Sequence, residues 1–177
     1  ISHFRGGNEW VGDNSAITWD GSDDGWSGGA PSTTNAANLL GAGNSQINVV
    51  GDQSASKILV DTTGGNTQAY TISGDSVTTG SLELISGGLT IANETTAAAA
   101  SVADGASLAI GDGGKLTTDT LTFANADSIS IEQGGTLELT SGSVSNAILA
   151  NNKGTVIMDS LTDGGTIGGT IQISKDS

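Results

Sequence analysis

The residues best equipped to bind a ligand form a short acidic segment, Asp20-Gly-Ser22-Asp-Asp24-Gly25. Oxygen-bearing side chains at alternate positions, followed by a glycine that permits a sharp turn, are typical of the first half of a calcium-binding loop. Pro31 stands where such a loop has its bidentate acid, so a distant carboxylate such as Asp13 would have to complete the shell. The segment predicts either a solvated acidic turn or a calcium site, for which the candidate residues are Asp13, Asp20, Ser22, Asp24 and Trp26.

Other side chains with catalytic potential are scarce. The chain has one histidine, His3, and no cysteine, which disfavours Ser/His or Cys/His nucleophilic catalysis and a clustered zinc site. Five basic residues offer little to a polysaccharide lyase, whereas a glycosidase needs only two carboxylates and the chain has 19 acids. We predict that the chain is not an enzyme and requires no cofactor, with a carbohydrate-active enzyme fragment as the least favoured alternative.

The charge balance restricts the partners. The net charge of the 177-residue chain is −14, which argues against nucleic acid, because phosphate binding depends on clustered Lys and Arg. No apolar run is long enough to span a membrane, so we expect no membrane insertion. The chain begins at Ile1 rather than Met, which fits a removed signal peptide or a fragment. This acidic, cysteine-free composition, rich in Gly and Thr, predicts an exported bacterial protein.

Aromatic residues gather at the start of the chain. Phe4, Trp10, Trp19 and Trp26 fall within the first 26 positions, and the single proline, Pro31, follows them. We interpret residues 1–40 as an N-terminal cap whose indole rings cover the open end of a coil. In the alternative interpretation, the three tryptophans stack against the sugar rings of a glycan.

The rest of the chain repeats one pattern, a glycine, a small or polar residue and a two-step apolar alternation. Alternation puts the apolar side chains on one face of a strand, and glycine accepts the positive φ of a tight corner. Short strands separated by corners are typical of a β-solenoid. The sequence therefore predicts an all-β fold, a parallel β-helix-like solenoid of about six to seven rungs over residues 41–177. The inward residues are expected to include Leu82, Leu84, Leu108, Ile110, Leu137, Leu139, Ile171 and Ile173.

Strand boundaries follow from the same alternation. Residues 95–103, which include four consecutive alanines, are compatible with a strand of small residues or with one turn of helix. The expected strands are 47–50, 57–60, 69–73, 82–86, 89–92, 107–110, 115–118, 120–123, 128–132, 136–140, 155–158 and 170–174.

The opening of the chain carries a family resemblance. The segments Gly6-Gly7-Asn8-Glu9-Trp10, Trp19-Asp20-Gly21 and Gly25-Trp26-Ser27-Gly28-Gly29-Ala30-Pro31 precede the glycine-rich strands. In this the chain resembles secreted bacterial β-helix surface proteins of the autotransporter-passenger type and proteins with autotransporter-associated strand repeats. The resemblance implies an adhesive or scaffolding role on the cell surface and carries over no catalytic residue.

The sequence thus predicts an extracellular structural protein of a surface fibre, sheath, layer or biofilm matrix; the alternative is a glycan-binding adhesin module that binds extracellular polysaccharide. The last predicted strand would leave Ile171 and Ile173 at an unpaired edge, a template for further pairing. Either a longer parent chain continues there, or Ile1–Phe4 of another copy adds to the edge. Such head-to-tail contact does not close and gives a filament, with Ile1, Phe4, Ile171 and Ile173 as the self-association residues.

Overall fold

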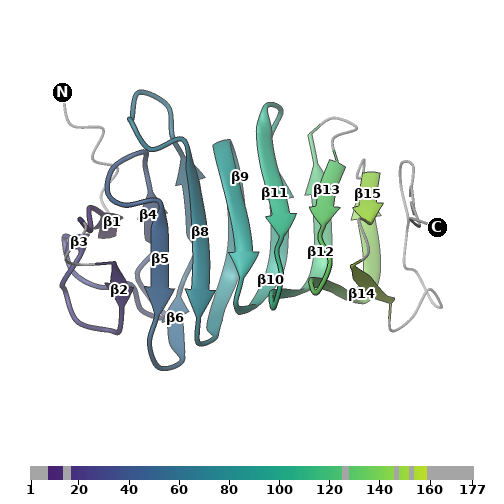
Figure 1. Ribbon diagram of the computed structural model, residues 1–177, viewed down its shortest axis with the longest axis horizontal. Coiled ribbons are helices and arrows are strands. Elements are labelled where there is room, and N and C mark those ends of the chain that lie inside the picture. The colour runs from purple at the N-terminus through teal and green to yellow at the C-terminus, as the bar shows by residue number, and fades with distance from the viewer. Residues whose placement is uncertain (1–7, 14–16, 125–127, 146–147, 152–153, 159–177) are drawn as a thin grey trace.

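The protein is an elongated β-solenoid, whose strands follow one another along a single axis (Figure 1). The computed structural model describes residues 8–13, 17–124, 128–145, 148–151 and 154–158. These residues contain strands and turns and no helix, and they make about five turns of stacked parallel coil. The predicted fold class is confirmed. The predicted total of six to seven rungs includes residues outside the described ranges and stays a prediction.

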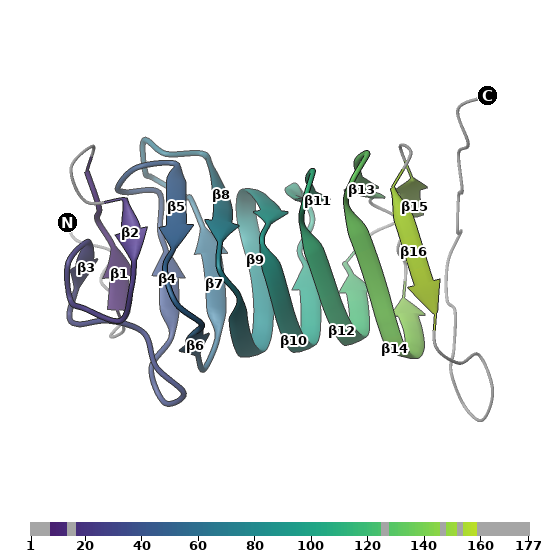
Figure 2. The same ribbon diagram turned by 60° about the horizontal axis from the view of Figure 1, so that its bottom comes forward.

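The strands form two hydrogen-bonded ladders that share the 16-residue strand β9 (Val77–Ala92). Within each ladder the strands of successive coils pair in parallel, and Figure 2 shows the order β10, β12, β14 and β16. The first ladder contains β1 (Asn8–Trp10), β3 (Trp26–Ser27), β4 (Ala37–Leu39), β6 (Gln53–Ala55), β7 (Ile58–Asp61), the start of β9, β10 (Glu94–Val102), β12 (Lys115–Phe123), β14 (Thr136–Ser145) and β16 (Thr155–Met158). The second contains β2 (Thr18–Trp19), β5 (Gln46–Val49), β8 (Ala69–Gly74), the end of β9, β11 (Ala106–Ile110), β13 (Ser128–Ile131) and β15 (Ile148–Asn151).

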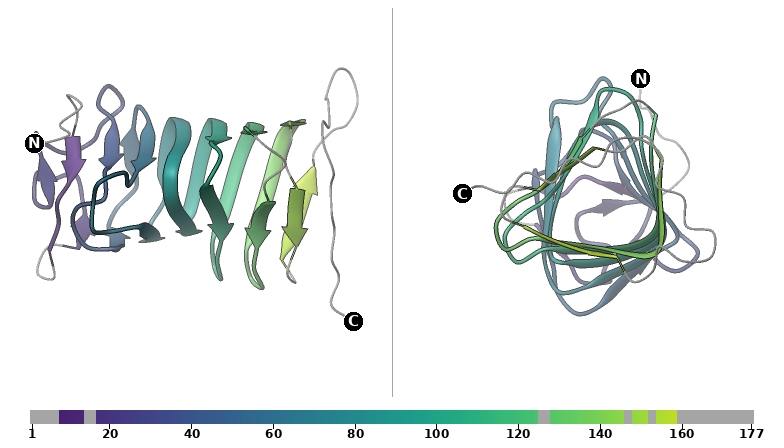
Figure 3. Two further views of the ribbon diagram at one scale, coloured as in Figure 1. Left: turned by 90° about the horizontal axis from the view of Figure 1, so that it is seen from above. Right: turned by 90° about the vertical axis from the view of Figure 1, so that its right-hand side faces the viewer.

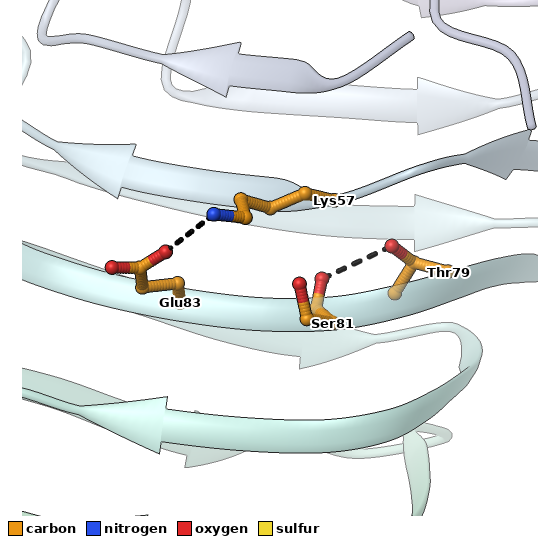
Figure 4. A network of polar contacts seen from close by, with 4 residues as sticks. All are labelled: Lys57, Thr79, Ser81 and Glu83. Atoms are coloured by element: carbon orange, nitrogen blue, oxygen red, sulfur yellow. Dashed lines mark hydrogen bonds and ion pairs between the residues drawn. The ribbon is translucent and has the colours of Figure 1, made fainter. Parts of the chain in front are cut away.

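The cross-section of the coil is three-sided (Figure 3), because the strands of the first ladder bend in the middle. In β9 the alternation of buried residues breaks between Thr79 and Leu82, and the parallel register skips Gly80. Buried Thr79 donates its hydroxyl to the carbonyl oxygen of Ser81 at 3.0 Å and stabilises the bend (Figure 4). We call the three sides face 1, face 2 and face 3. In β9, face 1 consists of residues 77–79, face 2 of residues 81–84 and face 3 of residues 88–92. Each face also includes the residues of the other coils that pair in register with these.

One continuous hydrophobic core runs through the stack. Face 3, with strands β5, β8, β9, β11 and β13, is turned toward the viewer in Figure 1. On this face an inward isoleucine repeats on five successive coils. Each is at most 1% exposed, because identical branched side chains at the strand spacing of about 4.8 Å pack directly on one another. The five are Ile47, Ile72, Ile91, Ile110 and Ile131.

Most of the predicted inward residues are confirmed. Leu82, Leu84, Leu108, Ile110, Leu137 and Leu139 are each at most 2% exposed. Ile171 and Ile173, and the predicted strand 170–174, lie outside the described residues. The ambiguous residues 95–103 form a strand, since β10 spans Glu94–Val102 and pairs with both β9 and β12.

The first coil contains the three tryptophans of the predicted cap, whose boundary at residue 40 stays a prediction. Trp10, Trp19 and Trp26 lie in the core at the N-terminal end, where β3 pairs antiparallel with β1 and ends the ladder. However, β1 also pairs in parallel with β4, and β4 pairs with β7. Parallel stacking therefore begins at Asn8 and runs through the predicted boundary at residue 40.

Candidate functional site

The three cap tryptophans form one packed cluster. Trp26 contacts both other rings edge-to-face, with centroids 5.1 Å from Trp10 and 5.3 Å from Trp19. The indole N–H of Trp10 donates to the carbonyl oxygen of Asn44 at 2.9 Å. Within the described residues, the buried Nε1 atoms of Trp19 and Trp26 have no hydrogen-bond acceptor.

This burial argues against the sugar-stacking interpretation. Stacking requires an accessible ring face, but Trp10, Trp19 and Trp26 are only 0%, 1% and 5% exposed. Their aromatic surfaces are used in packing against each other, an arrangement that aromatic pairs favour in cores. We therefore assign these residues to the cap and do not retain them as a glycan-stacking platform.

The candidate calcium segment folds as an exposed turn held by its own side chains. Asp20 accepts hydrogen bonds from the Ser22 hydroxyl at 2.6 Å and from the Ser22 backbone N–H at 3.0 Å, and these bonds lower the pKa of Asp20 below its usual value. Asp23, which is not among the predicted calcium ligands, accepts a hydrogen bond from the backbone N–H of Ala30 at 2.8 Å. The structure thus brings Asp20 and Ser22 together, as an acidic turn requires.

The remaining members of the candidate calcium set are Asp13, Asp24 and Trp26. Asp24 is exposed, and Trp26 is buried in the cap. Asp13 lines a shallow depression of about 400 Å³ together with Val11, Gly12, Gly43 and Asn44. Among the described residues, no three His, Cys, Asp or Glu side chains gather where they could hold a metal ion. Calcium binding stays a prediction.

The acidic turn stands at one end of a larger feature, an acidic edge along the corner between face 3 and face 1. Each face 3 strand from β2 to β13 is followed at this corner by an acidic residue. Contacts between coils fix the alignment: Asp75 accepts from the Gly51 N–H at 2.7 Å, and Ser76 donates to Asp52 at 2.7 Å. The edge comprises Asp20, Asp23, Asp24, Asp52, Asp75, Glu94, Asp112 and Glu132.

A second surface feature is a groove of about 190 Å³ where face 2 turns toward face 3. It crosses β9, β10 and β12, with Leu84 and Val102 beneath it. One wall is polar and consists of Glu83, Ser101 and Thr122, which are aligned in register on three coils. The other wall is aliphatic and consists of Ile85, Ala103 and Ala124. No sequence motif marked this groove, since its residues come from three separate repeats.

Ile1, Phe4, Ile171 and Ile173 lie outside the described residues. Within the described ranges, no helix has the length and apolar character needed to cross a membrane. The chain matches no family model, no curated protein and no solved structure in the comparisons made. The resemblance to secreted bacterial β-helix surface proteins therefore stays a prediction based on residues 6–31.

Proposed function

We propose that the chain is an extracellular structural protein, a rigid β-solenoid rod that contributes to a cell-surface fibre, sheath, layer or biofilm matrix. The observation that carries the proposal is the single core that runs unbroken from the tryptophan cluster to Leu139. Nearly all apolar side chains of the described coils serve stacking, and only Val11, Val50 and Ile157 are large, apolar and exposed. Such a core makes the rod long and stiff.

The charge of the surface suits a rod in water. A net charge of −14 favours solubility and keeps rods from associating sideways without a specific contact. The ion pairs Lys57–Glu83 and Lys115–Glu138, at 2.8 and 2.9 Å, each connect neighbouring coils and add to the cohesion of the rod. Exposed pairs of this kind contribute little singly, so the core dominates the rigidity.

Head-to-tail assembly belongs to the same proposal. At the N-terminal end, β3 and the tryptophan cluster cover the first coil, so a second copy cannot simply add its last coil there. Assembly would instead use the segment Ile1–Phe4 as an added strand on the C-terminal edge of another copy. A longer parent chain that continues the coil is the alternative.

Negative-stain microscopy of the purified chain, over a range of concentrations and with or without calcium, tests the proposal. Rods that join into filaments, and remain single folded rods after deletion of Ile1–Arg5, would support assembly. An intact chain that stays monomeric at high concentration would contradict self-assembly. Release of reducing sugars from a polysaccharide panel would contradict the structural role itself.

A further inference from the structure

We propose that the groove between the polar wall Glu83–Ser101–Thr122 and the aliphatic wall Ile85–Ala103–Ala124 binds a neutral glycan chain that lies along the solenoid axis. The proposal is independent of self-assembly, because the groove lies on the side of the rod and not at its ends.

The backbone fixes the two walls. Ser101 pairs in register with Glu83 on one side and with Thr122 on the other, so three polar side chains repeat at the strand spacing of about 4.8 Å. Backbone hydrogen bonds also join the coils beside the aliphatic wall. The Ala103 N–H donates to the Leu84 carbonyl oxygen at 2.8 Å, and the Ala124 N–H donates to the Val102 carbonyl oxygen at 2.9 Å. The groove is therefore preformed, and roughly 10 Å of its length runs along the axis.

The chemistry of the walls matches an amphipathic ligand. Ser101 and Thr122 are exposed, so a ligand in the groove can reach their hydroxyls. Ile85 and Ala103 are half-buried and offer an aliphatic surface opposite those hydroxyls. Sugar rings carry hydroxyls at their edges and C–H groups on their faces, which suits one polar and one aliphatic wall. The volume of about 190 Å³ lies below the ~300–1,000 Å³ of pockets that enclose a ligand. It therefore fits a short stretch of a longer chain.

The charge of the groove and of the whole protein favours a neutral glycan over an acidic one. Among the described residues that line the groove, Glu83 alone is ionisable, and its carboxylate is paired with the Lys57 ammonium at 2.8 Å (Figure 4). The groove is thus close to neutral, within a protein whose net charge of −14 repels polyanions such as uronic-acid polymers. It also lacks the local excess of acid that would attract a basic peptide.

Other macromolecular partners fit the groove less well. A peptide that binds as an added strand needs unpaired backbone groups at a sheet edge. The groove instead lies over β10, whose two edges are both paired, with β9 and with β12. A second copy of the chain would bring another 14 negative charges against this side.

The experiment is a titration of the isotope-labelled chain with cellohexaose, chitohexaose and maltohexaose as neutral probes, and with oligogalacturonate as the anionic comparison, followed by NMR. We expect amide shifts confined to residues 83–85, 101–103 and 122–124 with at least one neutral probe, and none with the anionic one. The double variant Ser101→Ala/Thr122→Val removes both hydroxyls and should weaken binding about tenfold. The matched control Ser107→Ala/Thr90→Val removes the same groups from face 3 and should bind like the parent chain.

Unchanged melting temperatures in both variants will show that the fold is intact. Dissociation constants weaker than about 1 mM for all neutral probes would overturn the proposal. So would shifts that fall outside the groove, preferred binding of the anionic probe, or equal losses in the groove variant and its control. Filament formation does not enter this test, so the two proposals stand or fall separately.

Discussion

Tyr70 offers the sharpest test of how the long corners of the first coils are held. Its ring lies in the inward column of face 3, below Leu89, and is 1% exposed. Its hydroxyl accepts a hydrogen bond from the Gly41 N–H at 2.8 Å and donates to the Ala42 carbonyl oxygen at 2.7 Å. One phenol group therefore satisfies two backbone groups of the corner that connects β4 to β5.

We expect Tyr70→Phe to keep the ring packing and lose both bonds. An unsatisfied buried polar group costs about 1–3 kcal/mol, so the free energy of unfolding should fall by about 2–4 kcal/mol. The corner cannot easily move to compensate, because Gly41 packs so closely that an added Cβ would stand 2.7 Å from the Gly65 Cα. For a chain of this length the melting temperature should drop by roughly 4–16 °C.

Urea unfolding followed by far-UV circular dichroism measures this difference, with Thr71→Val as the control. Thr71 is the next residue, points outward on the same strand and loses only a hydroxyl that makes no bond to a described residue. Its variant should stay within about 0.5 kcal/mol of the parent. If Tyr70→Phe also stays within that range, and the Gly41 amide exchanges no faster, the assignment of the corner to Tyr70 is wrong.

The same residue predicts a pH effect with a definite sign. Burial raises the pKa of Tyr70 from its usual 10.0 to about 12. Between these values the unfolded chain has lost the phenolic proton and the folded chain retains it, so the unfolded state binds fewer protons and stability falls as pH rises. The contribution is fully present below pH 10 and is lost as the pH rises through about 12. In Tyr70→Phe this part of the alkaline decline should be absent.

Three further predictions concern the core, the cation and the cap. Leu137→Asp buries an unpaired charge in face 1 and should cost several kcal/mol in urea unfolding, whereas Thr96→Asp, outward on the same face, should cost little. Calcium should raise the melting temperature, and Asp20→Ala/Asp24→Ala should remove that rise if the acidic turn is the site; an unchanged curve with excess chelator dismisses the site. The native tryptophan emission should be blue-shifted and resist acrylamide quenching, because all three rings are buried; strong quenching would refute the packed cap.

Much of the coil could be predicted from the sequence because its repeat is local. Leu82 and Leu84, or Leu108 and Ile110, sit two residues apart behind a glycine, and period-two alternation alone assigns them to the interior. The bends escaped this reasoning. Thr79 is a buried polar residue at a position where the alternation predicts an apolar one, and its hydroxyl donates a hydrogen bond to the carbonyl oxygen of Ser81. Thr118 does the same toward Thr120 on another coil, and nothing in the alternation distinguishes such threonines from solvent-facing ones.

The candidate surfaces were harder to predict, because they depend on register between coils and not on spacing along the chain. The inward isoleucines of face 3 are separated by 25, 19, 19 and 21 residues, since the corners differ in length. No fixed repeat therefore aligns Glu83 with Ser101 and Thr122, and only the parallel pairing of β9, β10 and β12 places them in one column.

The same dependence on register explains why the acidic residues look scattered in the sequence and are ordered in space. Asp52, Asp75, Glu94 and Asp112 are 18–23 residues apart, yet each follows a face 3 strand and so occupies the same corner. A fold that stacks corresponding corners at about 4.8 Å places the acids that follow these strands along one negative edge. Like charges on neighbouring coils repel each other along this edge and so destabilise the stack. The hydrogen bonds Asp75–Gly51 and Ser76–Asp52 act in the opposite direction and hold neighbouring coils together. The stability of the rod should therefore rise with ionic strength, in contrast to proteins stabilised mainly by surface ion pairs.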